Sequence, residues 1–117
     1  MIRQKNENGS VNVSTSVYTD IAGTAASNCF GVKGMAARSV TDGLYHLLRK
    51  DSAGKGVKVQ FHEDNSISID LHIMVDYGVN LNAVGASIIS EVRYVVQNHT
   101  GTEVRAVNVY VDSMVDG

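Results

Sequence analysis

The sequence contains no proline, no tryptophan and a single cysteine, and each absence narrows what the chain can be. One cysteine, Cys29, cannot form a disulfide within the chain, which is typical of a protein from a reducing cytoplasm. The first ten residues, MIRQKNENGS, lack an apolar stretch, so we expect no signal peptide. No apolar run approaches the length that a bilayer span needs. We therefore expect a cytoplasmic protein whose contact with a membrane is peripheral or through a partner, without direct insertion.

The sequence also lacks the spacings typical of metal, nucleotide and catalytic sites. It contains no G-x-G-x-x-G motif and no P-loop, and none of its histidines forms an H-x-x-x-H pair or lies beside the cysteine. The histidines are His46, His62, His72 and His99. We expect them to be single surface residues, and we expect no metal and no cofactor.

Three further groups are candidate catalytic residues. Cys29 stands at a predicted helix end before Phe30, where a small buried residue is expected rather than a nucleophile, because no base lies beside it in sequence. The pair Asp70 and Asp76 falls on a polar strand face, and Glu63-Asp64 falls in a turn. Neither position offers the burial that tunes a catalytic pKa. We therefore expect no enzymatic activity.

The strongest pattern is a β-hairpin between Gly54 and Asn80. Apolar and polar residues alternate with period two in VKVQF, 57–61, and in ISIDLHIMVD, 67–76, which predicts two half-buried strands. The segment between them, Glu63-Asp64-Asn65-Ser66, is a polar turn. Alternation also predicts a last strand in VRAVNVYVD, 104–112, and allows a short strand at Val11 and Val13.

Three helices are predicted from four-residue spacing. The first runs from about residue 17 to 28, with Val17, Ile21, Ala25 and Cys29 on one stripe, and a hydroxyl among residues 14–16 as its N-cap. The second spans about residues 40–50. The third carries a stripe through Val84, Ile88, Val92 and Val95, begins at Asn80 or Asn82, and ends at Gly101.

These elements predict an α+β fold of order (β)ααββαβ, a small mixed sheet with helices on one face. The strands at 67–76 and 104–112 should run parallel through the third helix. We expect a flexible tail over residues 1–13 with room for the short strand, one domain over 14–113, and a C-terminal tail over 114–117.

Charge is unevenly distributed along the chain. Residues 31–58 contain six basic and two acidic residues, whereas residues 59–117 contain two arginines and eight carboxylates. We predict an interaction surface at Lys33, Arg38, Arg49 and Lys50, which could meet the acidic half of a second copy in a head-to-tail contact. The alternative is that these residues are solvated faces without a partner.

The motif Gly31-Val32-Lys33-Gly34 supports an alternative function. A G-x-x-G loop between two helices is the layout of a KH domain, in which the loop clamps a nucleic-acid backbone. A helix C-cap followed by a turn explains both glycines without a ligand. We keep single-stranded RNA binding through this loop as the alternative hypothesis.

Five segments in sequence resemble the alkaline shock protein family, the envelope stress response proteins of mainly Gram-positive bacteria. They are the 17–35 segment with G-V-x-G-M, D-G-L at 42–44, K-G-V-K-V at 55–59, I-D-L-x-I-x-V-x-Y-G-V-N at 69–80 and T-G-x-E-V-x-x-V-N-V at 100–109. The chain departs from the family at Asn82, near which family members often carry a proline.

The resemblance implies a cytoplasmic protein without known enzymatic activity that is linked to cell-envelope homeostasis and stress. Some members are held near the membrane by a separate membrane protein. We therefore expect a scaffold or adaptor that acts through protein–protein contacts, with a membrane-anchored partner and self-association.

Overall fold

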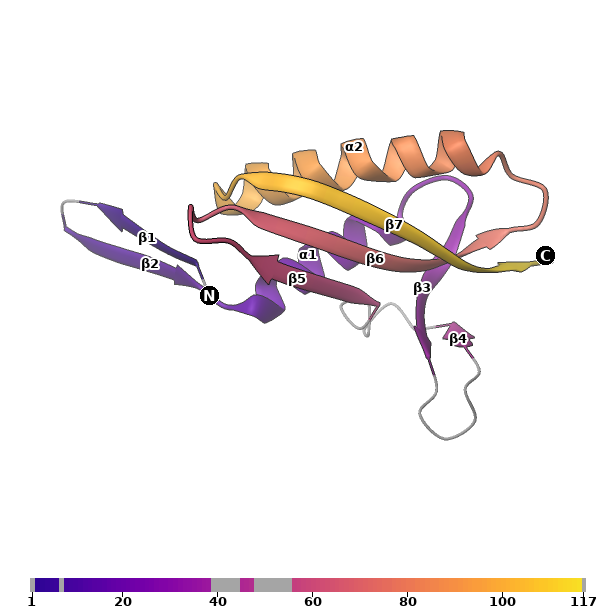
Figure 1. The fold of residues 1–117 in the computed structure, drawn as a ribbon, viewed down its shortest axis with the longest axis horizontal. Coiled ribbons are helices and arrows are strands. Elements are labelled where there is room, and N and C mark those ends of the chain that lie inside the picture. The colour runs from indigo at the N-terminus through magenta and orange to yellow at the C-terminus, as the bar shows by residue number, and fades with distance from the viewer. Residues whose placement is uncertain (1, 7, 39–44, 48–55, 117) are drawn as a thin grey trace.

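The chain folds around a five-stranded sheet with two helices beside it (Figure 1). The computed structural model describes residues 2–6, 8–38, 45–47 and 56–116. The strands are β1 Ile2–Asn6, β2 Gly9–Val13, β3 Val32–Arg38, β4 Tyr45–Leu47, β5 Val57–Phe61, β6 Ile67–Asp76 and β7 Val104–Val115. The helices are α1 Thr15–Ser27 and α2 Leu81–Thr100. The predicted α+β class is confirmed.

Strand β6 is the centre of the sheet. It pairs in parallel with β7 along one edge, and antiparallel with β5 and β3 along the other, and β4 extends the sheet from β3. The hairpin of β5 and β6 and the parallel return through α2 agree with the sequence prediction. Both follow from the sequence, in which apolar residues recur with period two in the strands and with a period of 3.6 residues in the helix.

One face of β6 holds the core. Ile67, Ile69, Leu71 and Ile73 have no exposed surface, and they face buried residues of both helices. Burying each such side chain contributes roughly 1.5–3 kcal/mol relative to leaving it in water. The alternate residues of β6 face the other side of the sheet, which no helix of the described chain covers. We call this side the open face.

The ends of α2 form as predicted. Asn80 is the N-cap, and its side-chain oxygen accepts a hydrogen bond from the Ala83 N–H at 3.0 Å. Gly101 takes the left-handed conformation with φ of 71° and donates its N–H to the Gln97 carbonyl. An asparagine cap and a glycine stop satisfy backbone groups that the helix itself leaves unpaired, so this helix is delimited by its own sequence.

The helix predicted over residues 40–50 is wrong where the structure describes the segment. Tyr45–Leu47 is strand β4, which pairs with Ala36, Ala37 and Arg38 of β3; residues 39–44 and 48–55 lie outside the described residues. Pairing with the edge of β3 satisfies the backbone of β4. The leucine spacing predicted a helix, but pairing with β3 determines the structure of these residues, and local sequence does not reveal that pairing.

The N-terminal segment, predicted as a tail with room for one short strand, contains a hairpin of β1 and β2. The two strands pair with each other from Ile2 opposite Val13 to Asn6 opposite Gly9, and they form a separate two-stranded sheet. The hairpin projects away from the main sheet (Figure 1). The boundaries of the predicted domain at residues 14 and 113 remain predictions.

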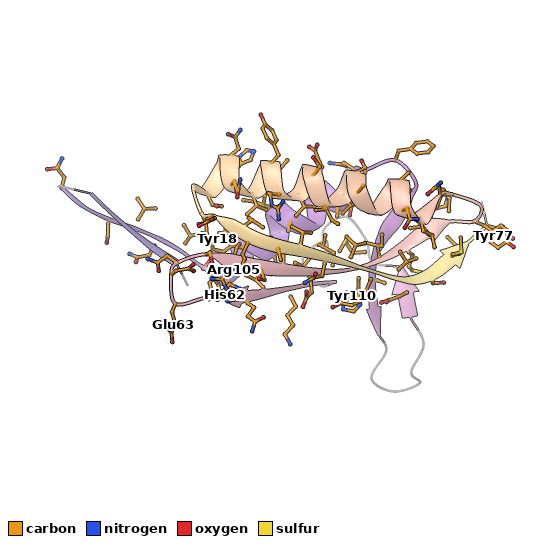
Figure 2. All side chains as sticks on the ribbon, turned by 45° about the horizontal axis from the view of Figure 1, so that its top comes forward. Tyr18, His62, Glu63, Tyr77, Arg105 and Tyr110 are labelled. Carbon is orange, nitrogen blue, oxygen red and sulfur yellow. The ribbon has the colours of Figure 1, made fainter. Side chains whose placement is uncertain are left out.

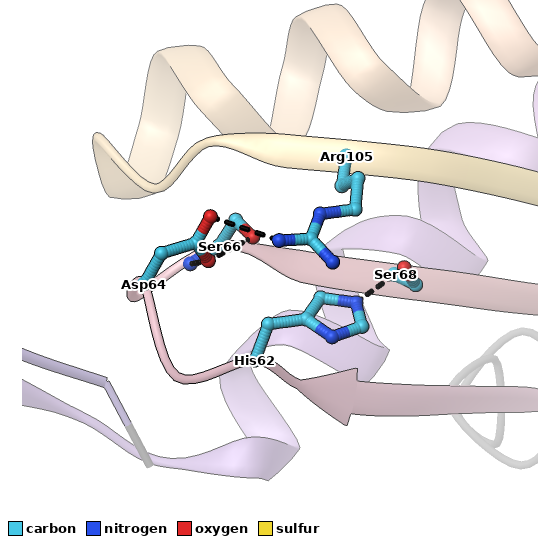
Figure 3. Close-up of polar contacts among 5 residues, drawn as sticks. All are labelled: His62, Asp64, Ser66, Ser68 and Arg105. Atoms are coloured by element: carbon cyan, nitrogen blue, oxygen red, sulfur yellow. Dashed lines mark hydrogen bonds and ion pairs between the residues drawn. The ribbon is translucent and has the colours of Figure 1, made fainter.

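The turn between β5 and β6 is fixed by Asp64. Its carboxylate accepts hydrogen bonds from the backbone N–H and the hydroxyl of Ser66, and it pairs with the Arg105 guanidinium at 2.9 Å (Figure 3). Asn65 beside it adopts a positive φ of 68°, a conformation that asparagine tolerates. The hydrogen bonds from Ser66, and after them that from Arg105, lower the pKa of Asp64 from 3.8 to about 2.

We expect Asp64→Asn to lose stability at neutral pH and to lose less of it in acid. Because the pKa is lower in the folded state, the ionised carboxylate stabilises the fold above pH 3.8, and this contribution disappears as the pH falls through about 2. Urea unfolding at a series of pH values would show the gap between wild type and variant closing across that window. Glu63→Gln removes the same charge from the same turn, so an identical pH course in both variants would contradict the role given to Asp64.

Candidate functional site: a groove between the two helices

A groove with a volume of about 560 Å³ runs between α1 and α2. Ala25 is buried at its floor, and Ile21, Cys29 and Val95 are half-buried. The other lining side chains are exposed and polar; they are Asp20, Thr24, Asn28, Ser87, Glu91 and His99. The groove is therefore apolar at its base and polar along its rims, which is the usual composition of a surface that binds a peptide or a small ligand.

Small residues of α1 explain why the two helices come close. Ala22, Gly23 and Ala26 are buried, and α1 packs directly on α2 as well as on β3 and β5. The stripe predicted from sequence on α1 is displaced from the centre of the core: Ile21, Ala25 and Cys29 line the groove. The position that sequence reasoning missed is Tyr18, which is fully buried with its hydroxyl 2.6 Å from the Thr102 hydroxyl.

The groove carries negative charge. Asp20 on α1 and Glu91 on α2 contribute one carboxylate from each wall, and no lysine or arginine of the described part of the chain lines the groove. Burial, and after it the charge of Glu91, raises the pKa of the Cys29 thiol above 9.0. The thiol donates a hydrogen bond to the Ala25 carbonyl at 3.4 Å. A thiol held protonated in this way is a poor nucleophile, in agreement with the sequence interpretation of Cys29.

Of the four predicted interaction residues, the structure describes the side chain of Lys33 only. Lys33 pairs with Asp76 of β6 at 3.2 Å, so its charge is matched within the chain. The side chain of Arg38 and all of Arg49 and Lys50 lie outside the described residues. The basic interaction surface therefore stays a prediction.

The G-x-x-G motif does not form a loop between two helices. Gly31 is a turn residue with φ of +88°, and Val32, Lys33 and Gly34 begin strand β3 opposite β6. A β-carbon at Gly31 would lie 3.0 Å from a methyl group of Val84, so this glycine allows the turn to pack against α2. The helix–loop–helix layout on which the RNA-binding alternative rested is absent.

The open face holds pairs of polar side chains. His62 Nε2 lies 2.7 Å from the Ser68 hydroxyl (Figure 3), and the Asn108 amide donates to Asp70 at 2.9 Å. His72 lies 3.0 Å from Asp112 and stacks on the ring of Tyr110. Figure 2 shows His62 and Tyr110 on the opposite side of the sheet from α2.

Each of these groups is satisfied by a neighbour rather than collected into one centre. In the part of the chain that the structure describes, no three histidine, cysteine or carboxylate side chains gather closely enough to hold a metal ion. The two candidate acid–base pairs are also divided, because Asp70, Asp76 and Asp64 each have a separate partner. The histidines and carboxylates of the open face therefore read as structural contacts.

Comparison with known proteins places the chain among envelope-related proteins. Residues 3–115 match the model of the alkaline shock protein 23 family, which is described as having a cell envelope-related function. The chain is 35% identical over 114 residues to the uncharacterized protein YloU of Bacillus subtilis (strain 168), covering 97% of this chain and 94% of that protein. It is 32% identical over 114 residues to the uncharacterized protein Spy1614 of Streptococcus pyogenes serotype M6, covering 97% and 93%. No solved structure matches the chain, and none of the described helices is both long and apolar enough to cross a membrane.

Proposed function

Because the chain belongs to the alkaline shock protein 23 family, whose function is cell envelope-related, we propose that it is a non-enzymatic adaptor that binds a membrane-anchored protein in the groove between α1 and α2. The adaptor would act on the cytoplasmic side of the membrane through that partner. The observation that carries the proposal is the groove itself, with an apolar floor and a carboxylate on each wall.

A helix is the partner element that suits this groove. The lining residues span 20–29, on α1 and the two residues after it, and 87–99 on α2, which corresponds to about 14 and 18 Å at about 1.5 Å per residue. A partner helix of about three turns would cover that length with its apolar side on Ile21, Ala25 and Val95. This is the helix-in-groove mode of peptide recognition, in which affinity comes from apolar anchors along one face of the bound helix.

The charge of the groove indicates which helix it would bind. Asp20 and Glu91 would attract lysine or arginine at the edges of the bound helix, and no lysine or arginine among the described lining residues would repel them. Segments that flank a membrane span on the cytoplasmic side carry an excess of lysine and arginine. A basic amphipathic segment next to the span of a membrane protein therefore has the chemistry that the groove would recognise.

The double variant Asp20→Lys and Glu91→Lys tests this proposal. We expect it to reduce capture of the partner from the membrane fraction of native cells by roughly tenfold, because two attractive contacts become repulsive. The matched control is Glu63→Lys with Glu103→Lys, which changes the net charge equally at two exposed positions outside the groove lining. The control should capture the partner as the wild type does.

Two results would contradict the adaptor. Equal capture by the groove variant and the control would show that the partner does not bind in the groove. Recovery that disappears on nuclease treatment in every variant would instead favour binding of a nucleic acid. Circular dichroism of each variant confirms that the helices are intact, so that loss of capture reports on the surface and not on folding.

A further inference from the structure

Strand β7 leaves one long edge of the sheet open. It has twelve residues, lies at the edge of the sheet (Figure 1) and pairs with β6 alone among the described strands. Alternate N–H and C=O groups of β7 therefore have no partner strand. An edge of this kind is a template for an additional strand, and proteins normally protect it with charge, proline, bulges or a covering element.

Helix α2 protects only the start of this edge. The Gln97 side chain accepts a hydrogen bond from the Val104 N–H at 2.9 Å, and the Arg93 guanidinium donates to the Arg105 carbonyl at 3.3 Å. From Ala106 to Val111, no described side chain bonds to the backbone of β7. Protection therefore stops where a regular segment begins.

The segment 106–111 has the properties of a pairing site. It keeps a regular register with residues 68–73 of β6, and the register shifts just before and just after it, at Arg105 and Asp112. Its sequence, AVNVYV, contains no charge and no proline and is rich in valine, and such segments have a high tendency to pair with another strand. We call residues 106–111 the acceptor segment.

The helix layer limits which strand can add to the acceptor segment. Helix α2 packs on β7, and α1 packs on β3 and β5, so a β7 or β5 strand of a second copy would bring its own helix next to α2. Neighbouring strands are about 4.8 Å apart, whereas packed helices need about 8–10 Å. Pairing through these edges with both helices on one face of the shared sheet would therefore crowd the two helices, and β4 has only three residues.

The β1–β2 hairpin meets this limit. Among the described residues its two strands pair with each other and not with the main sheet, and no extensive helix contact covers it. Each strand has five residues against the six of the acceptor segment. A two-stranded hairpin is marginally stable by itself in water. Its strand β1 carries Arg3 and Lys5 and no carboxylate, while the open face beside the acceptor segment carries Asp70 and Asp112.

We propose that the β1–β2 hairpin of one copy adds to the acceptor segment of β7 in a second copy. The added strand would lie beneath a shallow hollow of about 510 Å³ on the exposed side of α2. The hollow is lined by Ala86, Ile89, Ser90, Arg93, Tyr94 and Gln97. Arg93 Nε is buried there without a hydrogen-bond partner among the described residues, and an added strand would supply a carbonyl for it.

A complementation experiment tests the contact. One variant lacks residues 2–13 and cannot donate, and the other carries Asn108→Lys and Val111→Lys, at two exposed positions of the edge, and cannot accept. Sedimentation should show association of the wild type, monomers of each variant alone, and a one-to-one complex when the variants are mixed. A wild type that stays monomeric at every concentration, a deletion variant that still associates like the wild type, or a mixture that stays monomeric would each overturn the proposal.

Amide hydrogen exchange gives a readout that does not depend on the variants. Exchange of alternate amides in residues 106–111 should slow as the wild-type concentration rises, and it should not slow in the deletion variant. Exchange that is independent of concentration would contradict strand addition. Because the groove between α1 and α2 lies outside this contact, the deletion variant should still capture the membrane partner, which separates failure of this proposal from failure of the adaptor.

Discussion

Replacing Leu71 with alanine should lower the free energy of unfolding by about 2–5 kcal/mol. Leu71 lies in the middle of β6, between Val57 of β5 and Val109 of β7, and it has no exposed surface. The substitution removes buried methyl groups and leaves a cavity that the surrounding strands cannot close, because each is held by its own ladder. Urea unfolding followed by circular dichroism measures the change.

The matched control for this prediction is Leu81→Ala. Leu81 is the first residue of α2 and is 43% exposed, so its loss should change the free energy of unfolding by no more than about 0.5 kcal/mol. A loss for Leu71→Ala as small as that of Leu81→Ala would mean that β6 is not the centre of the core.

Gly56→Ala should destabilise the fold, whereas Gly85→Ala should stabilise it. A β-carbon at Gly56 would lie 2.7 Å from the Ala36 carbonyl oxygen and 2.9 Å from the His72 carbonyl oxygen. Both atoms belong to backbone at the junction of β3 and β6, where the His72 N–H also donates to Gly56. The junction would have to open, at a cost of about 1–3 kcal/mol.

Gly85→Ala is the matched comparison, because it is also a glycine-to-alanine substitution. It lies within α2, and a β-carbon there meets nothing within 4 Å. Alanine is preferred over glycine in a helix by about 0.5–1 kcal/mol, so this variant should gain that amount. In thermal unfolding, a gain in stability for Gly56→Ala would contradict the close approach at Gly56, and a loss for Gly85→Ala would contradict the open space at Gly85.

Prediction from sequence succeeded where local pattern and tertiary structure agree. The alternation of residues 57–76 and the cap and stop of α2 at Asn80 and Gly101 each arise from residues close in sequence, and each is confirmed. Residues 45–47 form a strand because they pair with the edge of β3. No pattern within the segment predicts that pairing. In the hairpin at residues 2–13, β1 pairs only with β2 among the described strands, and the sequence predicted a short strand at Val11 and Val13 without a partner for it.

The candidate site was harder to predict than the fold. The groove needs α1 and α2 side by side, and its two carboxylates, Asp20 and Glu91, lie more than seventy positions apart in the chain. The sequence placed Ile21, Ala25 and Cys29 on one stripe and predicted a buried Cys29, but it did not predict a groove. The signal that could have corrected this is the second apolar stripe through Tyr18, Ala22 and Ala26, which are all fully buried.

The groove, the edge of β7 and the open face have different roles in this proposal. The groove would receive the membrane partner, and the edge of β7 would receive a second copy, on a different part of α2. On the open face, polar side chains pair with one another. An adaptor that uses the first two surfaces independently could bind its partner at many points along an assembly.

The most direct test of the adaptor is site-specific photo-crosslinking in native cells. A photoreactive amino acid would replace Thr24, an exposed residue of the groove lining, and Gln60, an exposed residue of β5 outside it, as the control. We expect Thr24 to cross-link to a membrane protein through a basic amphipathic segment beside its membrane span, and Gln60 to give no such product. The adaptor proposal is contradicted if the two positions cross-link to the same partner equally, or if the product at Thr24 contains no membrane protein.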